Sequence, residues 1–223
     1  MAQIEVFYRI CPFSNGKSPV FTDDKYRLAE FCLRSYVAAF PMAKTTFILD
    51  SCPPEYHRLV EDYGRIVAED NMGNIGSYLK QLELTNRLDD EQPAYLAEDD
   101  YYYLPQAGRL VVGAINAGGF VTPSDFAEFY QNKIDLSHAP KRNIEGHTFR
   151  RVPSSCLTFG GKAKLFKANY QTFVRYGISD YPMWLEVGQR YPLYAPYPTL
   201  STHLVIGLLS PGVDWQRLWS DSL

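Results

Sequence analysis

Three consecutive carboxylates follow a short apolar segment in the middle of the chain, where Tyr95-Leu96-Ala97 leads directly into Glu98-Asp99-Asp100. Carboxylate oxygens are the ligands that hard divalent cations such as Mg²⁺ and Mn²⁺ prefer. Such a cation can bridge two phosphates and offset the charge that develops when a bond to a diphosphate breaks. The segment therefore predicts a metal-assisted site, and the alternative is an acidic surface turn.

Other carboxylates also stand where an apolar segment ends. Asp50 follows Thr45–Leu49, and Glu69-Asp70 follows Arg65–Ala68. If these segments are parallel strands, their carboxyl ends share one edge of a sheet, which is where ligands of such sheets bind. Like charges gathered there repel one another unless a cation or ligand hydroxyl groups offset them. We therefore expect the acidic strand ends to converge on a ligand.

Three further residues are candidates for contact with a phosphorylated ligand. Asn74 and Ser77 stand at the start of an expected helix, whose free backbone N–H groups can receive ligand oxygens. Simple helix capping is the alternative. Arg9 lies close to the end of the first expected strand, and a guanidinium can pair with a phosphate in a fork. A surface salt bridge is the alternative for Arg9.

The elements that must position these residues alternate between strand and helix in the first half. The sequence predicts strands over Ile4–Ile10, Thr45–Leu49, Arg65–Ala68 and Ala94–Ala97. It predicts helices over Lys25–Phe40, from Pro54 to Gly64, from Gly73 to about Leu88, and from Pro105 to Gly118. Such alternation predicts an α/β fold, with a mostly parallel (mixed) central sheet and helices on both faces.

The second half is less regular in sequence. We expect a helix over Pro123–Gln131, an extended segment over Arg150–Thr158, and a mostly helical segment over Gly160–Tyr176. A short helix after Asp180 and a tail rich in Pro and Tyr complete the chain. We expect one domain over 1–223, with 1–120 binding the nucleotide and 121–223 forming an irregular lobe that faces an acceptor.

Composition narrows the classes of function. The net charge of −3 argues against a general nucleic-acid coat protein. The four cysteines form no CxxC pair, so we expect no zinc site. Their even number allows two disulfides, but without a secretion leader we expect free thiols in a reducing cytoplasm. The opening MAQIEVFYRI does not read as a secretion leader, and no apolar run approaches the length of a membrane span.

The segment from Lys141 to Lys167 is basic, because it contains seven Lys and Arg residues and a single acid, Glu145. A solvated basic face is one interpretation. The other is a surface for a phosphorylated acceptor, such as a lipid-linked glycan or modified DNA. The chain has no GxxxxGK[ST], no GxGxxG after the first strand and no GxSxG. These absences argue against a P-loop enzyme, a Rossmann dehydrogenase and a serine hydrolase, in that order.

The sequence resembles the GT-A glycosyltransferases, especially the large inverting group with a DxD-type motif. The resemblance spans about the first 130 residues in element order. It is carried by IEVFYRI, LAEFCLRSYVAAF, FILD, NMGNIGSYLKQLEL and YLAEDDYYYLP, together with PTLSTHL in the tail. The resemblance implies a GT-A-like fold and transfer of a sugar from a UDP- or GDP-sugar to an acceptor hydroxyl, with Mn²⁺ or Mg²⁺.

Roles at individual positions follow from this resemblance. Asp50 matches the acid that contacts the nucleoside, and Glu98 and Asp100 match the two ends of the DxD motif, with Glu in place of the first Asp. Asp100 is then the metal ligand, Glu98 or Asp99 faces the ribose or the metal, and His203 completes the metal site.

An inverting enzyme of this group also needs a carboxylate that removes the acceptor proton. The group places it near a helix start in the second half, so Asp180 is the first choice and Glu186 the second. Asp180 as a helix cap is the alternative. Two other functions stay open, a nucleotidyltransferase that releases pyrophosphate and a non-catalytic relative that only binds nucleotide.

Overall fold

The structure is a computed structural model that describes residues 3–13, 18–127, 129 and 136–222. In its first half, strands and helices alternate as the sequence predicts. The strands are β1 (Glu5–Ile10), β2 (Lys44–Asp50), β3 (Arg65–Glu69) and β4 (Pro93–Glu98). The helices are α1 (Lys25–Ala39), α2 (Pro54–Val60), α3 (Gly73–Asn86) and α4 (Ala107–Asn116).

The second half contributes strands β6 (Phe120–Val121), β7 (Lys141–Ile144), β8 (His147–Val152), β9 (Phe159–Lys162) and β10 (Leu193–Tyr197). These join the first four strands in a nine-stranded sheet of order β3-β2-β1-β4-β9-β6-β10-β8-β7. The β3-β2-β1-β4 part is parallel, whereas β9 pairs antiparallel with both β4 and β6. The sheet is therefore mixed and mainly parallel in its first half, as the sequence predicts.

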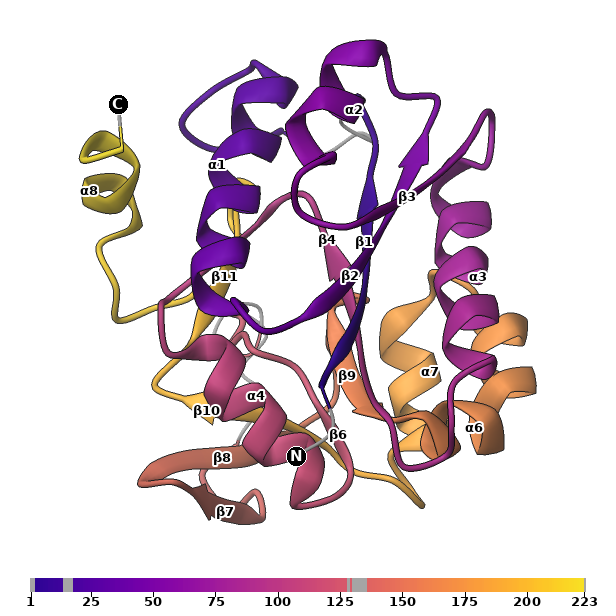
Figure 1. Cartoon of the computed structure of the whole chain (residues 1–223). Helices are drawn as coiled ribbons and strands as arrows, with labels where there is room; N and C mark the ends of the chain where they lie inside the picture. The colour runs from indigo at the N-terminus through magenta and orange to yellow at the C-terminus, as the bar shows by residue number, and fades with distance from the viewer. Residues whose placement is uncertain (1–2, 14–17, 128, 130–135, 223) are drawn as a thin grey trace.

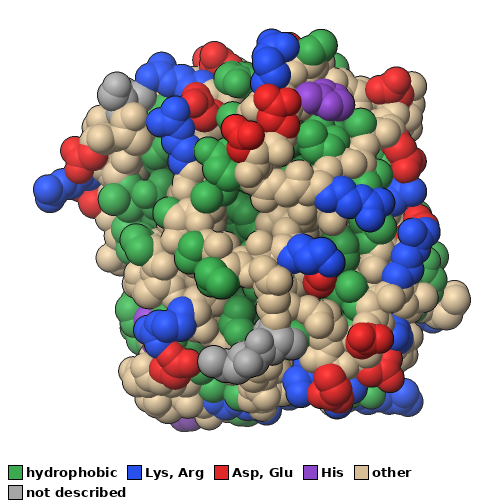
Figure 2. Space-filling model, viewed as in Figure 1, with side chains coloured by type: hydrophobic (Ala, Val, Ile, Leu, Met, Phe, Trp, Pro, Cys, Tyr) green, Lys and Arg blue, Asp and Glu red, His purple; other side chains and the backbone are tan. Residues whose placement is uncertain are grey.

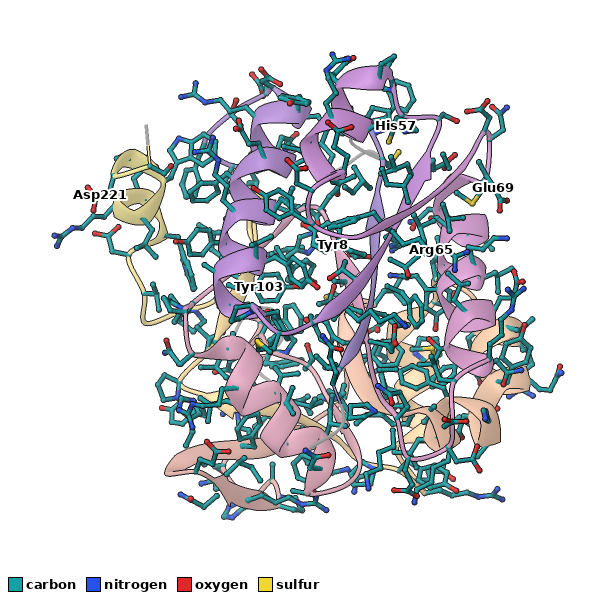
Figure 3. The ribbon with its side chains drawn as sticks, in the orientation of Figure 1. Tyr8, His57, Arg65, Glu69, Tyr103 and Asp221 are labelled. Atoms are coloured by element: carbon teal, nitrogen blue, oxygen red, sulfur yellow. The ribbon has the colours of Figure 1, made fainter. Side chains whose placement is uncertain are left out.

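Helices cover both faces of this sheet. Figure 1 shows α1 and α4 on one side, and α3 with α6 (Ala163–Tyr176) and α7 (Asp180–Val187) on the other. Apolar residues buried beneath them form the main core. Aromatic rings fill much of it, and Figure 3 shows Tyr8 and Tyr103 in the interior beside α1. Since burial of apolar surface is the main favourable term in folding, this core holds the sheet and its two helical layers together.

The second half is more regular than the sequence predicts. The segment from Gly160, expected to be helical, begins instead as strand β9, and α6 starts only at Ala163. Two glycines explain the difference. A Cβ on Gly160 would lie 2.8 Å from the carbonyl oxygen of Ala94, and one on Gly161 would lie 2.8 Å from the Phe120 ring. Both positions need a residue without a side chain, because the neighbouring strands pass so close.

Two other expectations for the second half also change. The extended segment ends with β8 at Val152, and the loop after it has positive φ at Cys156 and Leu157. Pro123 to Asp125 is not helical, since Ser124 forms an isolated bridge with Ser201. Residues 128, 130 and 131 of the helix expected over Pro123–Gln131 lie outside the described part of the chain.

A small second sheet connects the carboxylates to the tail. It pairs β5 (Tyr101–Tyr103) antiparallel with β11 (Ser201–His203), and the register places His203 opposite Tyr101. The Leu204 N–H donates to the Asp100 carbonyl at 2.8 Å. The tail then continues to α8 (Trp215–Ser220), whose Trp219 packs on α1. This pairing therefore brings the late histidine beside the carboxylates.

Within the described residues, no helix combines the length and the apolar character needed to cross a membrane.

Candidate functional site

A cavity of about 520 Å³ opens at the carboxyl ends of β1, β2 and β4. Nine of the ten residues that the sequence nominates line this cavity: Arg9, Asp50, Asn74, Ser77, Glu98, Asp99, Asp100, Asp180 and His203. The wall also includes side chains that the sequence reading did not select, among them Lys25, Phe13, Ser154 and Tyr181. The fold therefore gathers the candidate residues at the sheet edge where ligands of α/β proteins bind.

Each of the three consecutive carboxylates has a basic partner from a different element. Glu98 pairs with Arg9 of β1, which stands beside it in the register of β1 and β4. The other two pairs are Asp99 with Lys25 of α1, at 2.7 Å between Oδ1 and Nζ, and Asp100 with His203 of β11, at 2.9 Å between Oδ2 and Nε2. The structure thus joins β1, α1 and β11 at one short segment.

Burial and these partners set the ionisation of the acidic segment. Burial raises the pKa of Asp99, against the opposing charge of Lys25. Burial also acts to raise the pKa of Asp100, but His203, Lys25 and Arg9 outweigh it and hold that pKa well below its usual range. For Lys25, burial acts to lower the pKa, and Asp99 and Asp100 reverse this and raise it. Asp100 and Lys25 are therefore charged at neutral pH.

Both terminal nitrogens of Arg9 donate hydrogen bonds to other residues of the protein. Its Nη1 donates to the carbonyl oxygen of Asn74 at 2.9 Å, to Asn74 Oδ1 at 2.6 Å and more weakly to Ser77 Oγ at 3.4 Å, while its Nη2 pairs with Glu98. The residue is 9% exposed. Arg9 therefore ties β1 and β4 to the start of α3, and this interaction is internal rather than a surface salt bridge.

The Asp50 carboxylate accepts two backbone hydrogen bonds at the start of α3. Its Oδ1 and Oδ2 accept the N–H groups of Met72 and Gly73 at 2.9 and 2.7 Å. Ser77 Oγ donates within the helix to the Gly73 carbonyl at 2.9 Å. A carboxylate at a helix start is favoured by the partial positive charge there. Asp50 therefore caps the start of α3, which also fixes its position on the cavity wall. Asn74 and Ser77 do not cap the helix, because Asn74 Oδ1 accepts from Arg9 and Ser77 Oγ donates to a carbonyl.

Not every acidic strand end reaches the cavity. Glu69 pairs with Lys80 at 2.7 Å on the edge strand β3, and Figure 3 shows it at the outer margin of the sheet. Neither Glu69 nor Asp70 is among the residues that line the cavity. The convergence expected from the sequence therefore holds for Asp50 and for the Glu98-Asp99-Asp100 segment, and is wrong for the end of β3.

Asp180 stands at the first position of α7 and supports a strained loop. Its two oxygens accept five hydrogen bonds: from Ser154 Oγ at 2.6 Å, Ser155 N at 3.0 Å, Ser155 Oγ at 2.7 Å, Leu157 N at 3.1 Å and Trp184 Nε1 at 3.1 Å. Cys156 and Leu157 in this loop have φ of 46° and 64°. Such backbone conformations persist only when their surroundings hold them. Asp180 therefore shapes one wall of the cavity.

Glu186 lies outside this site. It is on the exposed surface of α7, where Arg175 donates to both of its oxygens at 2.5 Å and the Tyr176 hydroxyl donates at 2.9 Å. These neighbours lower the pKa of Glu186. Of the two candidates for a catalytic base, the structure brings only Asp180 into the cavity.

Four of the seven basic side chains between 141 and 167 form ion pairs with acidic side chains. Lys162 and Lys164 both pair with Glu91, and Lys167 pairs with Asp90. Arg150 is 11% exposed in its side chain and pairs with Asp125. On the face seen in Figure 2, Lys and Arg side chains are interspersed with Asp and Glu. This pairing favours the solvated face over a phosphate-binding surface for this stretch.

Asp100 and His203 are the pair on the described wall that could share a cation, because Asp100 Oδ2 and His203 Nε2 lie 2.9 Å apart, close to the spacing of two neighbouring ligands on one ion. Asp100 Oδ1 and His203 Nδ1 are buried and have no hydrogen-bond partner within the described part of the chain. The described residues contain no group of three or more His, Cys, Asp or Glu arranged to hold a metal ion. A cation here would need further oxygen ligands, and Mg²⁺ in enzymes takes such ligands from substrate phosphates and water. The residues therefore fit a metal that binds together with a nucleotide.

Comparison with known proteins is informative only at the level of structure, because no family model and no curated protein matches the chain. A 4-diphosphocytidyl-2C-methyl-D-erythritol synthase from Anaerococcus prevotii has a TM-score of 0.52 and 11% identity, covering 99% of this chain and 95% of that one. A nucleotidyl transferase from Methanothermobacter has a TM-score of 0.50 and 11% identity, covering 86% of both chains.

Residues 1–349 of TarS from S. aureus have a TM-score of 0.53 and 11% identity, covering 86% of this chain and 57% of that one. At such identities the likeness shows the fold alone. The chain has a GT-A-like α/β fold.

Proposed function

We propose that this chain is a glycosyltransferase that takes a sugar from a UDP- or GDP-sugar, with Mn²⁺ or Mg²⁺ bound beside the diphosphate. The observation that carries the proposal is the meeting of Asp100 and His203, 103 positions apart, at 2.9 Å in the wall of the cavity. The 2.9 Å between Asp100 Oδ2 and His203 Nε2 is close to the spacing of two neighbouring ligands on one cation. A carboxylate and an imidazole are both good ligands for these cations.

The charge of the cavity supports the need for a cation. Five carboxylates line its described wall, those of Asp50, Glu98, Asp99, Asp100 and Asp180, against the two cationic side chains Arg9 and Lys25. A diphosphate that entered alone would meet a net excess of like charge. A divalent cation held by Asp100 and His203 would offset that repulsion and the charge that develops on the departing diphosphate.

Asp180 is the base in this proposal, and the structure suggests how an acceptor would reach it. The Ser154 hydroxyl donates to Asp180 Oδ2 at 2.6 Å, so a hydroxyl already occupies one position from which a proton can be passed. An acceptor hydroxyl that displaced Ser154 would face the same oxygen. Tyr181, the next residue in α7, lines the cavity and is 50% exposed, so its ring is available to an acceptor sugar.

A nucleotidyltransferase is the second candidate, because one of the similar structures carries that name and covers 86% of this chain. Such an enzyme would join a nucleoside triphosphate to a phosphorylated partner and release pyrophosphate. The two candidates differ in the nucleotide they consume and in the product they release.

A product analysis separates them. The full chain is incubated with UDP-glucose, UDP-galactose or GDP-mannose, and separately with each nucleoside triphosphate and a sugar phosphate, with and without Mn²⁺. Slow release of UDP or GDP that depends on Mn²⁺ supports the glycosyltransferase. Release of pyrophosphate supports the nucleotidyltransferase, and binding without turnover in either set supports a non-catalytic relative.

A further inference from the structure

Lys25 occupies a place in the cavity that no motif pointed to. It is the first residue of α1, its side chain is 12% exposed, and its Nζ lies 2.7 Å from Asp99 Oδ1. An ammonium carries three N–H donors. Asp99 takes one of them, and no second hydrogen bond joins Nζ to the described residues. The remaining donors are therefore available to a ligand in the cavity that Lys25 lines.

Arg9 cannot donate a hydrogen bond to a ligand without breaking bonds that stabilise the fold. Both of its terminal nitrogens already bond the protein, Nη1 to Asn74 and Nη2 to Glu98. Turning that guanidinium toward a ligand would leave the Glu98 carboxylate buried without its partner, which is costly. Of the two cationic side chains on the described wall, Lys25 is the one with donors to spare.

Resting on the proposed function, we propose that Lys25, rather than Arg9, is the cationic side chain that binds the diphosphate of the nucleotide. Asp99 holds the ammonium in place and balances its charge while the cavity is empty. A diphosphate oxygen then accepts one of the remaining N–H groups without breaking the bond to Asp99. The role of Asp99 is thus to position Lys25, and the cation stays with Asp100 and His203.

A pair of variants separates ligand contact from charge balance. K25Q removes the ammonium and leaves Asp99 with the Cys11 N–H but without a cationic partner, whereas K25Q/D99N removes both charges and restores the balance. The matched controls are K167Q and K167Q/D90N, because Lys167 and Asp90 form a pair of the same 2.7 Å length on the exposed surface. Each variant is titrated with UDP and GDP by calorimetry in saturating Mn²⁺, and with uridine and guanosine by ligand-detected NMR. Melting temperatures report whether each variant folds.

We expect K25Q and K25Q/D99N both to bind the nucleoside diphosphate about 10- to 100-fold more weakly, the usual effect of losing a hydrogen bond to a charged group. Nucleoside affinity should stay within about twofold, and both controls should match the wild type. If K25Q/D99N binds the diphosphate as tightly as the wild type, Lys25 only neutralises Asp99 and the inference is wrong. Equal losses for nucleoside and diphosphate would also overturn it. A wild-type protein that binds no nucleotide would refute the proposed function itself.

Discussion

Replacement of Asp180 by Asn tests whether this carboxylate anchors the cavity wall. The Ser155 N–H bonds one carboxylate oxygen, while the Leu157 N–H and the Trp184 indole N–H bond the other. These donors cannot reverse their direction, whereas the Ser154 and Ser155 hydroxyls can rotate. An amide has one oxygen and one NH₂ group, so in either orientation it opposes at least one fixed donor.

The cost of D180N follows from that opposition. The Leu157 N–H and the Trp184 indole N–H also reach Ser155 Oγ, so the change removes a bond to a charged group rather than every acceptor. Losing such a bond costs about 1.5–3 kcal/mol, which corresponds to a fall of roughly 3–12 °C in Tm for a chain of this size. The assay is thermal unfolding followed by circular dichroism. The matched control is E186Q, because Glu186 makes its bonds on the exposed surface of the same helix. We expect E186Q to change stability by no more than about 0.5 kcal/mol.

Two outcomes would contradict this reasoning. Unfolding of D180N within about 1 °C of the wild type would show that the five bonds to Asp180 contribute little to the fold. An equal fall in Tm for D180N and E186Q would show that the buried bonds to Asp180 and the surface bonds to Glu186 contribute equally to stability. A loss of turnover with unchanged stability would leave Asp180 as a base without a structural role.

Three further predictions follow from the site. R9M should destabilise the chain by about 3–5 kcal/mol in urea unfolding, because it leaves Glu98 buried and unpaired; a cost below about 1 kcal/mol would contradict the internal role of Arg9. H203N should weaken UDP binding in Mn²⁺ by at least about tenfold and leave metal-free binding unchanged, and equal losses in both conditions would argue against a metal ligand. Burial raises the pKa of the half-buried Cys11 and Cys52 thiols, that of Cys52 to about 12. Both thiols should therefore react slowly with iodoacetamide at pH 8. Because Cys11 lines the cavity, UDP should slow its reaction further. Fast labelling of both, or no protection of Cys11, would contradict that environment.

The sequence predicts the first half of the fold well because local rules decide it. Apolar segments of strand length alternate with helices such as Lys25–Ala39, and each buried strand ends at a polar residue. The placement of Asp50 and Asp100 at one sheet edge then follows from parallel pairing alone. These are features that a short window of sequence contains.

The second half needs contacts that no short window contains. Strand β9 depends on how closely Ala94 and Phe120 approach Gly160 and Gly161, and β6 has only two residues. A helical pattern that begins near Gly160 therefore describes α6 correctly and misses the strand before it. Tertiary packing overrides local preference at these positions.

For the site as well, the sequence indicates some features and leaves others out. The types of residue at Arg9 and Asp99 are visible in the sequence, but their partners are not. Nothing in the spacing of Lys25 and Asp99, 74 positions apart, indicates that they form an ion pair. For that reason the sequence reading assigns the phosphate to Arg9 and overlooks Lys25. A Lys that opens a helix directly after a long loop is a weak indication that could have raised the question.

The central claim is that a divalent cation and a nucleoside diphosphate bind this cavity together, with Asp100 and His203 as the protein ligands of the metal. The most direct measurement is the concentration of free Mn²⁺ by electron paramagnetic resonance, as the chain is titrated with and without UDP or GDP. Because the protein supplies two ligands and the diphosphate the others, Mn²⁺ should bind weakly alone and at least about tenfold more tightly with the nucleotide, beyond its binding to nucleotide in solution. Mn²⁺ binding that is the same with and without nucleotide would contradict the account.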